Sequence, residues 1–177
     1  SVYEVYQTKS SNDTPSHPVA IFARDVETSM QVWISEQGYA GGEWYLDFHK
    51  KHRESGHRYW RVTSLHADLG LKTQYQPEKI EAALNEDAAH FVDSIKSALT
   101  KFKASHGYEG TLTAPFDSEL FGHWWFEGPQ FLKKIFELLC GDPEINVAHC
   151  EEIMDTHPPQ KVIAIPEGSW GAGGNHY

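Results

Sequence analysis

The longest regular pattern of hydrophobic positions predicts a helix that begins at Pro77. From there apolar side chains recur at spacings of three and four residues, which places them on one helical face: Ile80, Leu84, Ala88, Phe91, Ile95, Leu99 and Phe102. Proline suits the first helical turn, and Gly107 follows the last apolar position as a typical C-terminal residue. A second amphipathic pattern predicts a helix over Gly128–Leu139.

Short apolar runs between polar stretches predict buried strands at Val19–Ala23, Tyr108–Phe116 and Lys161–Ile165. The aromatic and β-branched content of His57–Ser64 is also typical of a strand. Further helices are expected to start within Glu27–Ile34, to cover Trp44–Ser55 as an amphipathic helix, and to occupy part of Val147–Pro159. Strands that alternate with helices predict an α/β fold with parallel strands.

The chain divides by composition into two parts. Residues 1–18 are polar, with a Ser-Ser-Asn-Asp-Thr-Pro run, and we expect them to form a lead-in loop. Residues 19–177 are expected to form a single α/β domain, because 177 residues is an ordinary domain size.

Charge and composition exclude several classes of protein. A net charge of -10 argues against a nucleic-acid partner, because phosphate binding relies on a basic surface. We expect no membrane span, since no apolar run approaches about 20 residues. The first residues lack signal-peptide features and the two cysteines make no disulfide framework, so a cytoplasmic protein is expected. His49 with His52, and His149 with Cys150, lack four-ligand zinc spacing, so we expect no metal and no cofactor.

The stretch PFDSELFGHWWFEGP, Pro115–Pro129, carries the chemistry that stands out. It brings the carboxylates of Asp117 and Glu119 together with one histidine, His123, and two tryptophans, Trp124 and Trp125. A carboxylic acid can protonate a glycosidic oxygen, and aromatic faces can stack on pyranose rings. The alternative is an acidic loop that caps a helix, with tryptophans in the core. Trp124 and Trp125 cannot share a helix face, so one of them is expected in the core.

Within that stretch, DSELFGHWWFEGP resembles the fourth conserved motif of glycoside hydrolase family 57, in the form found in its branching enzymes. Three other segments are similar to parts of that family in the same order: HPVAIFARDVETSMQVWISEQGYAGG, RYWRVTS and PEGSWGAGGNHY, the last resembling the fifth motif. The resemblance extends from His17 to Tyr177. It implies that the fold is the later part of an incomplete parallel (β/α)7 barrel.

The resemblance also implies roles for individual residues. Asp117 aligns with the family's general acid/base, Trp33 and Trp170 with residues that line the donor and acceptor sites, and Gly41 with a position where the backbone approaches the sugar. Two roles stay open. Arg24 contacts substrate or forms an ion pair with a neighbour such as Asp25, and His123 binds a sugar hydroxyl, orients Asp117 or is structural.

Retaining glycosidases need a second carboxyl group, the nucleophile. The family's nucleophile is a glutamate in an earlier motif with no counterpart here, and the glutamates present do not match its position: Glu27, Glu36, Glu119 and Glu167. The expected chain is therefore a truncated C-terminal part of a catalytic barrel that holds half of a catalytic pair. Its expected partners are an α-glucan and the missing N-terminal half of the domain.

Three functional hypotheses follow. The first is a segment of a 1,4-α-glucan branching enzyme, with an α-amylase or a 4-α-glucanotransferase of the same family as the alternative. The second is a non-catalytic α-glucan-binding module. The third is a partial barrel that folds only with its missing half, because open strand edges invite association.

Overall fold

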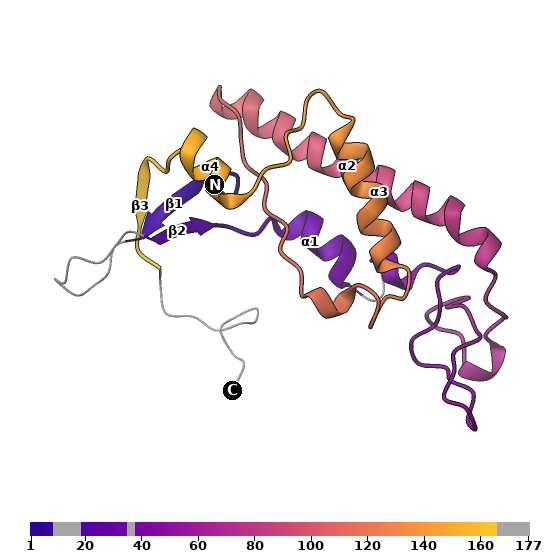
Figure 1. Cartoon of the computed structure of the whole chain (residues 1–177). Helices are drawn as coiled ribbons and strands as arrows, with labels where there is room; N and C mark the ends of the chain where they lie inside the picture. Colours follow the sequence, from indigo (N-terminus) through magenta and orange to yellow (C-terminus); the bar gives the residue numbers. More distant parts are fainter. Residues whose placement is uncertain (9–18, 35–37, 166–177) are drawn as a thin grey trace.

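The computed structural model describes residues 1–8, 19–34 and 38–165 (Figure 1). In these ranges the chain forms three strands and four α-helices: β1 (Val5–Thr8), β2 (Val19–Phe22), α1 (Val26–Trp33), α2 (Pro77–His106), α3 (Gly128–Cys140), α4 (Cys150–Thr156) and β3 (Lys161–Ile163). Short 3-10 turns are η1 (Tyr39–Gly41), η2 (Leu69–Leu71) and η3 (Ser118–Leu120). Figure 1 shows the sheet and α4 at one end, irregular loops at the other, and α1, α2 and α3 between them.

The sheet has the order β2-β1-β3 and mixes both strand directions. β1 pairs antiparallel with β2, with Val5 opposite Phe22, and parallel with β3, with Gln7 opposite Val162. The expectation of parallel strands is therefore wrong for the β1–β2 pair. The expected lead-in loop is also wrong at Val5–Thr8, because this short strand is specified by distant partners on both sides rather than by local pattern. Residues 9–18 lie outside the described residues.

The N-terminal segment is fixed to the sheet by Glu4. Its carboxylate accepts hydrogen bonds from the Lys161 ammonium and the hydroxyls of Tyr108 and Tyr6. The Lys161 ammonium, followed by the Tyr108 hydroxyl, lowers the pKa of Glu4 to about 2. This carboxylate thus joins residues from the two ends of the described chain.

The main core lies between α2 and α3. Both helices form where the hydrophobic pattern predicted them. α2 runs from Pro77 to His106, and Gly107 ends it at a φ of 80°, a conformation that favours glycine. The buried apolar residues of this core come from both helices, from α1 and from the neighbouring loops: Val32, Tyr39, Tyr45, Ile80, Leu84, Ala88, Phe91, Val92, Ile95, Trp125, Phe131, Ile135 and Leu139. Outside the core, Lys134 of α3 reaches Glu81 and Asn85 of α2.

The helix expected over Trp44–Ser55 is not formed. Asp47 is buried, and its Oδ1 accepts hydrogen bonds from the backbone N–H groups of His49 and Lys50 at 2.8 and 2.6 Å. Its Oδ2 lies 2.6 Å from the buried Lys72 ammonium. These local bonds compete with helical ones, so the segment forms an irregular loop.

Two expected strands are reduced to isolated bridges. In His57–Ser64, Trp60 bridges Gln74 and Arg61 bridges Leu46. In Tyr108–Phe116, Thr113 makes a parallel bridge to Arg24. Of the other predictions, β2, β3, α1 and α4 lie within or close to the expected segments. Among the described residues, no helix is long and apolar enough to cross a membrane.

Candidate functional site

Asp117 stands at the head of the loop that joins the extended segment after Gly110 to α3. Its backbone carbonyl accepts a hydrogen bond from Leu120 N at 3.1 Å and so starts η3. Its side chain is exposed and makes no capping bond to this turn. Within the described part of the chain, the carboxylate has neither a hydrogen-bond partner nor an ion pair. It is therefore free to meet a ligand.

Arg24 lies beside the same segment, at the end of β2. The Arg24–Thr113 bridge is parallel, and Asp25 N donates to Thr113 O at 2.9 Å. Neighbouring parallel segments have their carboxyl ends on the same side. Arg24 and the loop that begins at Asp117 therefore both follow the carboxyl ends of their segments. Arg24 is exposed, and within residues 1–8, 19–34 and 38–165 no ion pair includes it.

Asp25, the partner considered for Arg24, has a structural role instead. It is buried and caps α1, because its Oδ2 accepts from Thr28 N at 2.8 Å and from Thr28 Oγ1 at 2.6 Å. Its Oδ1 accepts from the Tyr3 hydroxyl at 2.8 Å. Burial opposes the charged form, but these bonds outweigh it and hold the pKa of Asp25 below its usual value. Burial, together with the Asp25 carboxylate, raises the pKa of Tyr3 to about 12.

Trp125 connects the motif to the core and confirms that one of the two tryptophans is buried. It is 2% exposed, and its ring packs against Phe131 at 4.7 Å and Tyr45 at 5.1 Å between centroids. Tyr39 of η1 stacks on it at 6.5 Å. Gly41 ends η1 and donates its N–H to Gly38 O at 3.1 Å, so this expected site residue is held against the same core as the motif.

His123 and Trp124 lie on the outer side of the loop. The His123 ring is exposed and makes edge contacts with Trp124 at 5.3 Å and with Phe48 at 5.8 Å. Trp124 is 45% exposed, and its N–H donates to Glu119 O at 3.2 Å. The backbone thus folds back toward Asp117, and His123 belongs to the same short loop as that carboxylate.

Glu127 closes the loop as a fully buried acid. Its Oε1 accepts from Leu46 N at 3.0 Å, while Oε2 has no hydrogen-bond partner of normal geometry among the described residues; the Tyr75 hydroxyl acts to lower the pKa of the carboxyl but is outweighed by burial. Burial raises the pKa of this carboxyl, because removing water disfavours its charged form. Glu127 therefore holds the irregular loop at Leu46 against the start of α3.

The remaining predicted positions are not described. Trp33 is the last residue of α1, and its side chain lies outside the described residues, as does Trp170. Among the described residues, no group of three or more histidine, cysteine or acidic side chains is placed to hold a metal ion.

Sequence reasoning missed Phe48 and Arg58. The Phe48 ring lies 4.4 Å from the Trp124 ring, tilted by 34°, and the Arg58 guanidinium lies 4.4 Å from its centroid. Both residues were assigned to regular elements by local pattern. The alternation of basic and aromatic residues over 48–61 is the signal that points to an exposed binding loop.

Comparisons with known proteins agree with the motif resemblance. No family model matches the chain. The 1,4-alpha-glucan branching enzyme of Thermococcus kodakarensis is 41% identical over 172 residues, which is 97% of this chain and 24% of that protein. The crystal structure of the GH57-type branching enzyme of Pyrococcus horikoshii is 40% identical, with a TM-score of 0.89, over 100% of this chain and 32% of that one.

The α-amylase AmyC of Thermotoga maritima is also similar, at 33% identity and a TM-score of 0.84, over 97% of this chain and 35% of that one. The chain thus spans about a quarter of the curated relative that it matches. The solved structure of the Thermococcus branching enzyme has a TM-score of 0.87 at 40% identity, so both branching enzymes exceed the amylase in identity and in TM-score. The chain belongs to glycoside hydrolase family 57, as a segment that matches part of the proteins named as branching enzymes.

Proposed function

We propose that this chain supplies the general acid/base side of a retaining α-glucan-acting site, in an enzyme that forms α-1,6 branches from α-1,4-linked chains. The proposal places the chain as the later part of an incomplete (β/α)7 barrel. The observation that carries it is the exposed carboxylate of Asp117, which has no side-chain partner among the described residues and stands at the head of a loop four residues after Thr113, the residue that bridges Arg24. The printed names of the relatives support the branching reaction.

The proposed chemistry uses Asp117 twice. As an acid it protonates the oxygen of the departing glucan chain, while a nucleophilic carboxylate attacks the anomeric carbon. As a base it then removes the proton from the 6-hydroxyl of an acceptor glucan, which attacks the glycosyl-enzyme intermediate and displaces the nucleophile. The nucleophile is proposed to come from residues outside this sequence. Arg24 and His123 are proposed to bind sugar hydroxyls on either side of Asp117.

The test replaces the matched segment of the Thermococcus kodakarensis enzyme with these residues and incubates the hybrid with amylose. We expect new α-1,6 linkages, and we expect Asp117→Asn to abolish them while leaving thermal unfolding unchanged, because the Asp117 side chain is exposed and has no partner in the described part of the chain. Asp155→Asn, at an exposed position on α4, is the matched control. Equal branching by the Asp117→Asn and Asp155→Asn hybrids would refute the role of Asp117.

The second candidate is hydrolysis of the same α-1,4 links. The similarity to the Thermotoga maritima α-amylase favours it. Hydrolysis and transfer share the acid/base and differ in whether water or a sugar hydroxyl reaches the intermediate. Products that contain new reducing ends and no α-1,6 linkages would select hydrolysis. A cytoplasmic location and the absence of a cofactor stay predictions.

A further inference from the structure

We propose that Trp124, Phe126 and the loop 46–59 form a second binding surface, which holds an uncharged α-glucan chain beside the Asp117 loop. We call it the outer platform, made of Phe48, Arg58, Tyr59, Trp124 and Phe126. The inference rests on the proposed function for its ligand, and it adds a subsite on residues other than Arg24, His123 and Asp117.

The outer platform exposes aromatic rings next to a hollow. Tyr59 and Phe126 are 50% and 51% exposed, and with Leu46, Lys51, His57 and Arg58 they line an open hollow of about 600 Å³. The Phe48 ring packs against the Trp124 ring, at 4.4 Å between ring centroids. Arg58 links the hollow to the Phe48–Trp124 pair, because it lines the hollow and its guanidinium lies over Phe48. Exposed aromatic rings grouped in this way mark interaction sites, because leaving them in water costs free energy. A pyranose ring has an apolar C–H face that can cover such rings.

Hydrogen-bond donors surround these rings. The Arg58 guanidinium lies over Phe48 at 4.4 Å, and its Nη1 reaches His123 O at 3.5 Å. The Lys51 ammonium lies 5.7 Å from the same ring centroid. A few donors beside an apolar surface are what fixes the orientation of a polar ligand. Sugar hydroxyl oxygens would accept from these N–H groups while the ring covers the aromatic faces.

The outer platform is rigidly connected to the loop of Asp117. Trp124 N donates to Glu119 O, two residues after Asp117, and Trp125 N donates to Leu120 O at 2.8 Å. On the other side, the buried Glu127 carboxyl holds Leu46 N at 3.0 Å. A chain bound across Trp124 would therefore be held in a fixed position relative to Asp117, which favours reaction by positioning.

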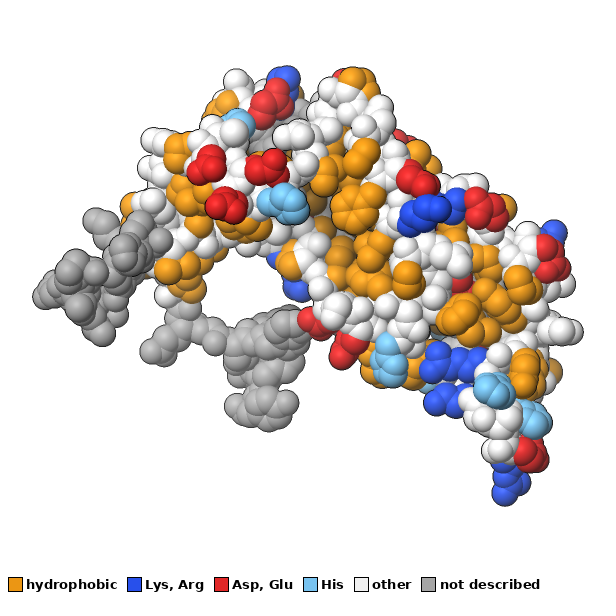
Figure 2. Space-filling view, in the orientation of Figure 1, with side chains coloured by type: hydrophobic (Ala, Val, Ile, Leu, Met, Phe, Trp, Pro, Cys, Tyr) orange, Lys and Arg blue, Asp and Glu red, His pale blue; other side chains and the backbone are white. Residues whose placement is uncertain are grey.

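Charge must be weighed, because residues 49–61 are locally basic. They contain Lys50, Lys51, Arg53, Arg58 and Arg61 with one acid, Glu54. Figure 2 shows Lys, Arg and His side chains gathered over these loops.

However, two of these cations already have partners. Lys50 lies over the Trp60 ring, and Arg61 lies over the Trp44 ring while also contacting Glu43. The net charge of -10 also repels a polyanion and leaves an uncharged glucan unaffected. The observations therefore favour the glucan.

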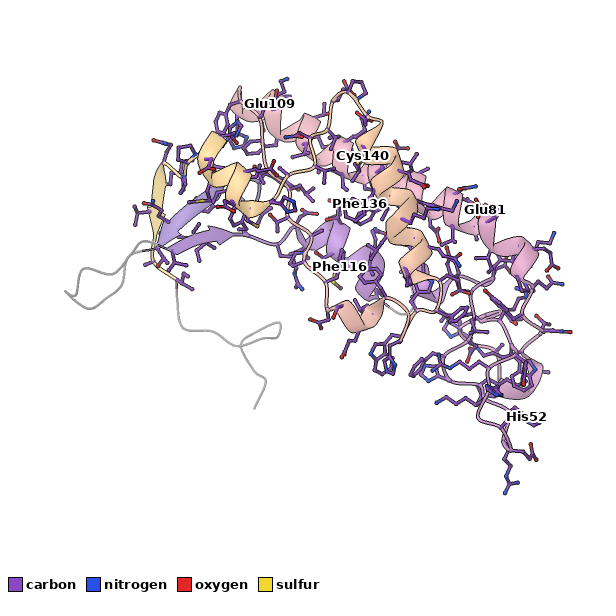
Figure 3. The ribbon with its side chains drawn as sticks, in the orientation of Figure 1. His52, Glu81, Glu109, Phe116, Phe136 and Cys140 are labelled. Atoms are coloured by element: carbon purple, nitrogen blue, oxygen red, sulfur yellow. The ribbon has the colours of Figure 1, made fainter. Side chains whose placement is uncertain are left out.

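The experiment measures binding of maltoheptaose to the 177-residue chain by calorimetry, at low and high salt. We expect Trp124→Ala and Phe126→Ala each to weaken binding about tenfold, as for truncated aromatic anchors at interfaces. Phe136→Ala is the matched control, because Phe136 is also 51% exposed but lies on α3, away from the loop that carries His52 (Figure 3). Circular dichroism checks that each variant is folded.

The outcomes separate this inference from the proposed function. Binding that is insensitive to salt, weakened about tenfold in each of the two platform variants and kept in Phe136→Ala and Asp155→Asn supports the outer platform, whatever the hybrid enzyme does. No binding by the unchanged chain overturns it, as does equal binding by all variants. Binding of heparin in place of maltoheptaose, with strong salt dependence, also overturns it, because the basic loop would then select polyanions.

Discussion

Replacing the buried Glu127 by glutamine should stabilise the protein at neutral pH. Glu127 is 0% exposed, and among the residues that the structure describes only its Oε1 has a hydrogen-bond partner of normal geometry, Leu46 N. Burial raises the pKa of the carboxyl above its usual value of 4.5. Above that pH the unfolded chain releases the proton more readily than the folded one, so the contribution of Glu127 to stability falls as pH rises. The fall ends once pH passes the folded-state pKa.

The expected gain follows from what glutamine keeps and what it removes. The amide oxygen can still accept from Leu46 N, and the variant has no charge to bury. A buried polar group without a partner costs about 1–3 kcal/mol, and a charged group costs more, so exchanging the carboxylate for a neutral amide should recover about 2 kcal/mol. That gain should raise the melting temperature by roughly 4–8 °C for a chain of this size. Below pH 4 the carboxyl is protonated in both states, and the difference should approach zero.

The assay is thermal unfolding by circular dichroism from pH 3.5 to pH 8 for the unchanged chain and three variants. Glu127→Gln should gain stability progressively above pH 4.5. Glu127→Ala should lose stability at every pH, because Leu46 N would then lack its acceptor. Glu86→Gln, at an exposed position on α2, is the control for removing one negative charge.

A different result would refute the reasoning. If Glu127→Gln lowers the melting temperature at pH 8 as much as Glu127→Ala does, the ionised carboxylate itself stabilises the loop. If the gain is present but does not change with pH, it comes from packing and not from the titration of Glu127.

Three further substitutions test the packing around the site. Lys72→Met leaves the buried Asp47 carboxylate unpaired and should cost about 3–5 kcal/mol, measured by urea unfolding, whereas Lys101→Met on the exposed face of α2 should not. Leu84→Ala, at a fully buried position of α2, should cost about 2–5 kcal/mol in the same assay. Gly122→Ala places a side chain at a φ of 98° and should cost about 1–2 kcal/mol, while Gly70→Ala, where a Cβ meets open space at an ordinary φ, should cost less.

The sequence predicts elements whose stabilising contacts repeat along the chain. α2 and α3 have their apolar residues every three or four positions, and both form as expected. The helix expected over Trp44–Ser55 has a similar pattern, but Asp47 bonds to nearby backbone and to Lys72, 25 residues away. β1 was missed for the related reason that it is held by pairing with β2 on one side and with β3, more than 150 residues further along the chain, on the other. A local sequence pattern does not predict ion pairs or strand pairing between residues that are far apart in the sequence.

The same limit applies to the site. Asp117, His123 and Arg24 could be named from the sequence, because one contiguous motif and one strand end carry them. The pairing of Arg24 with Thr113, on the segment that leads to Asp117, comes only from the structure, because no sequence spacing reveals it. Phe48 and Arg58 lie more than 60 residues before Trp124 in the sequence. Their place in the same surface cluster could therefore be seen only in the structure.

The two adjacent tryptophans explain why the motif is both structural and chemical. Gly122, at a φ of 98°, donates its N–H to Trp125 O at 2.7 Å, and this tight turn sends Trp125 inward and Trp124 outward. Trp125 then anchors the loop on Tyr45 and Phe131, while Trp124 faces solvent. The shape of the loop that presents Asp117 thus depends on residues that never touch a substrate. Similarity in this motif therefore argues first for the shape of the loop, and the catalytic role of Asp117 must be tested by changing that carboxylate alone.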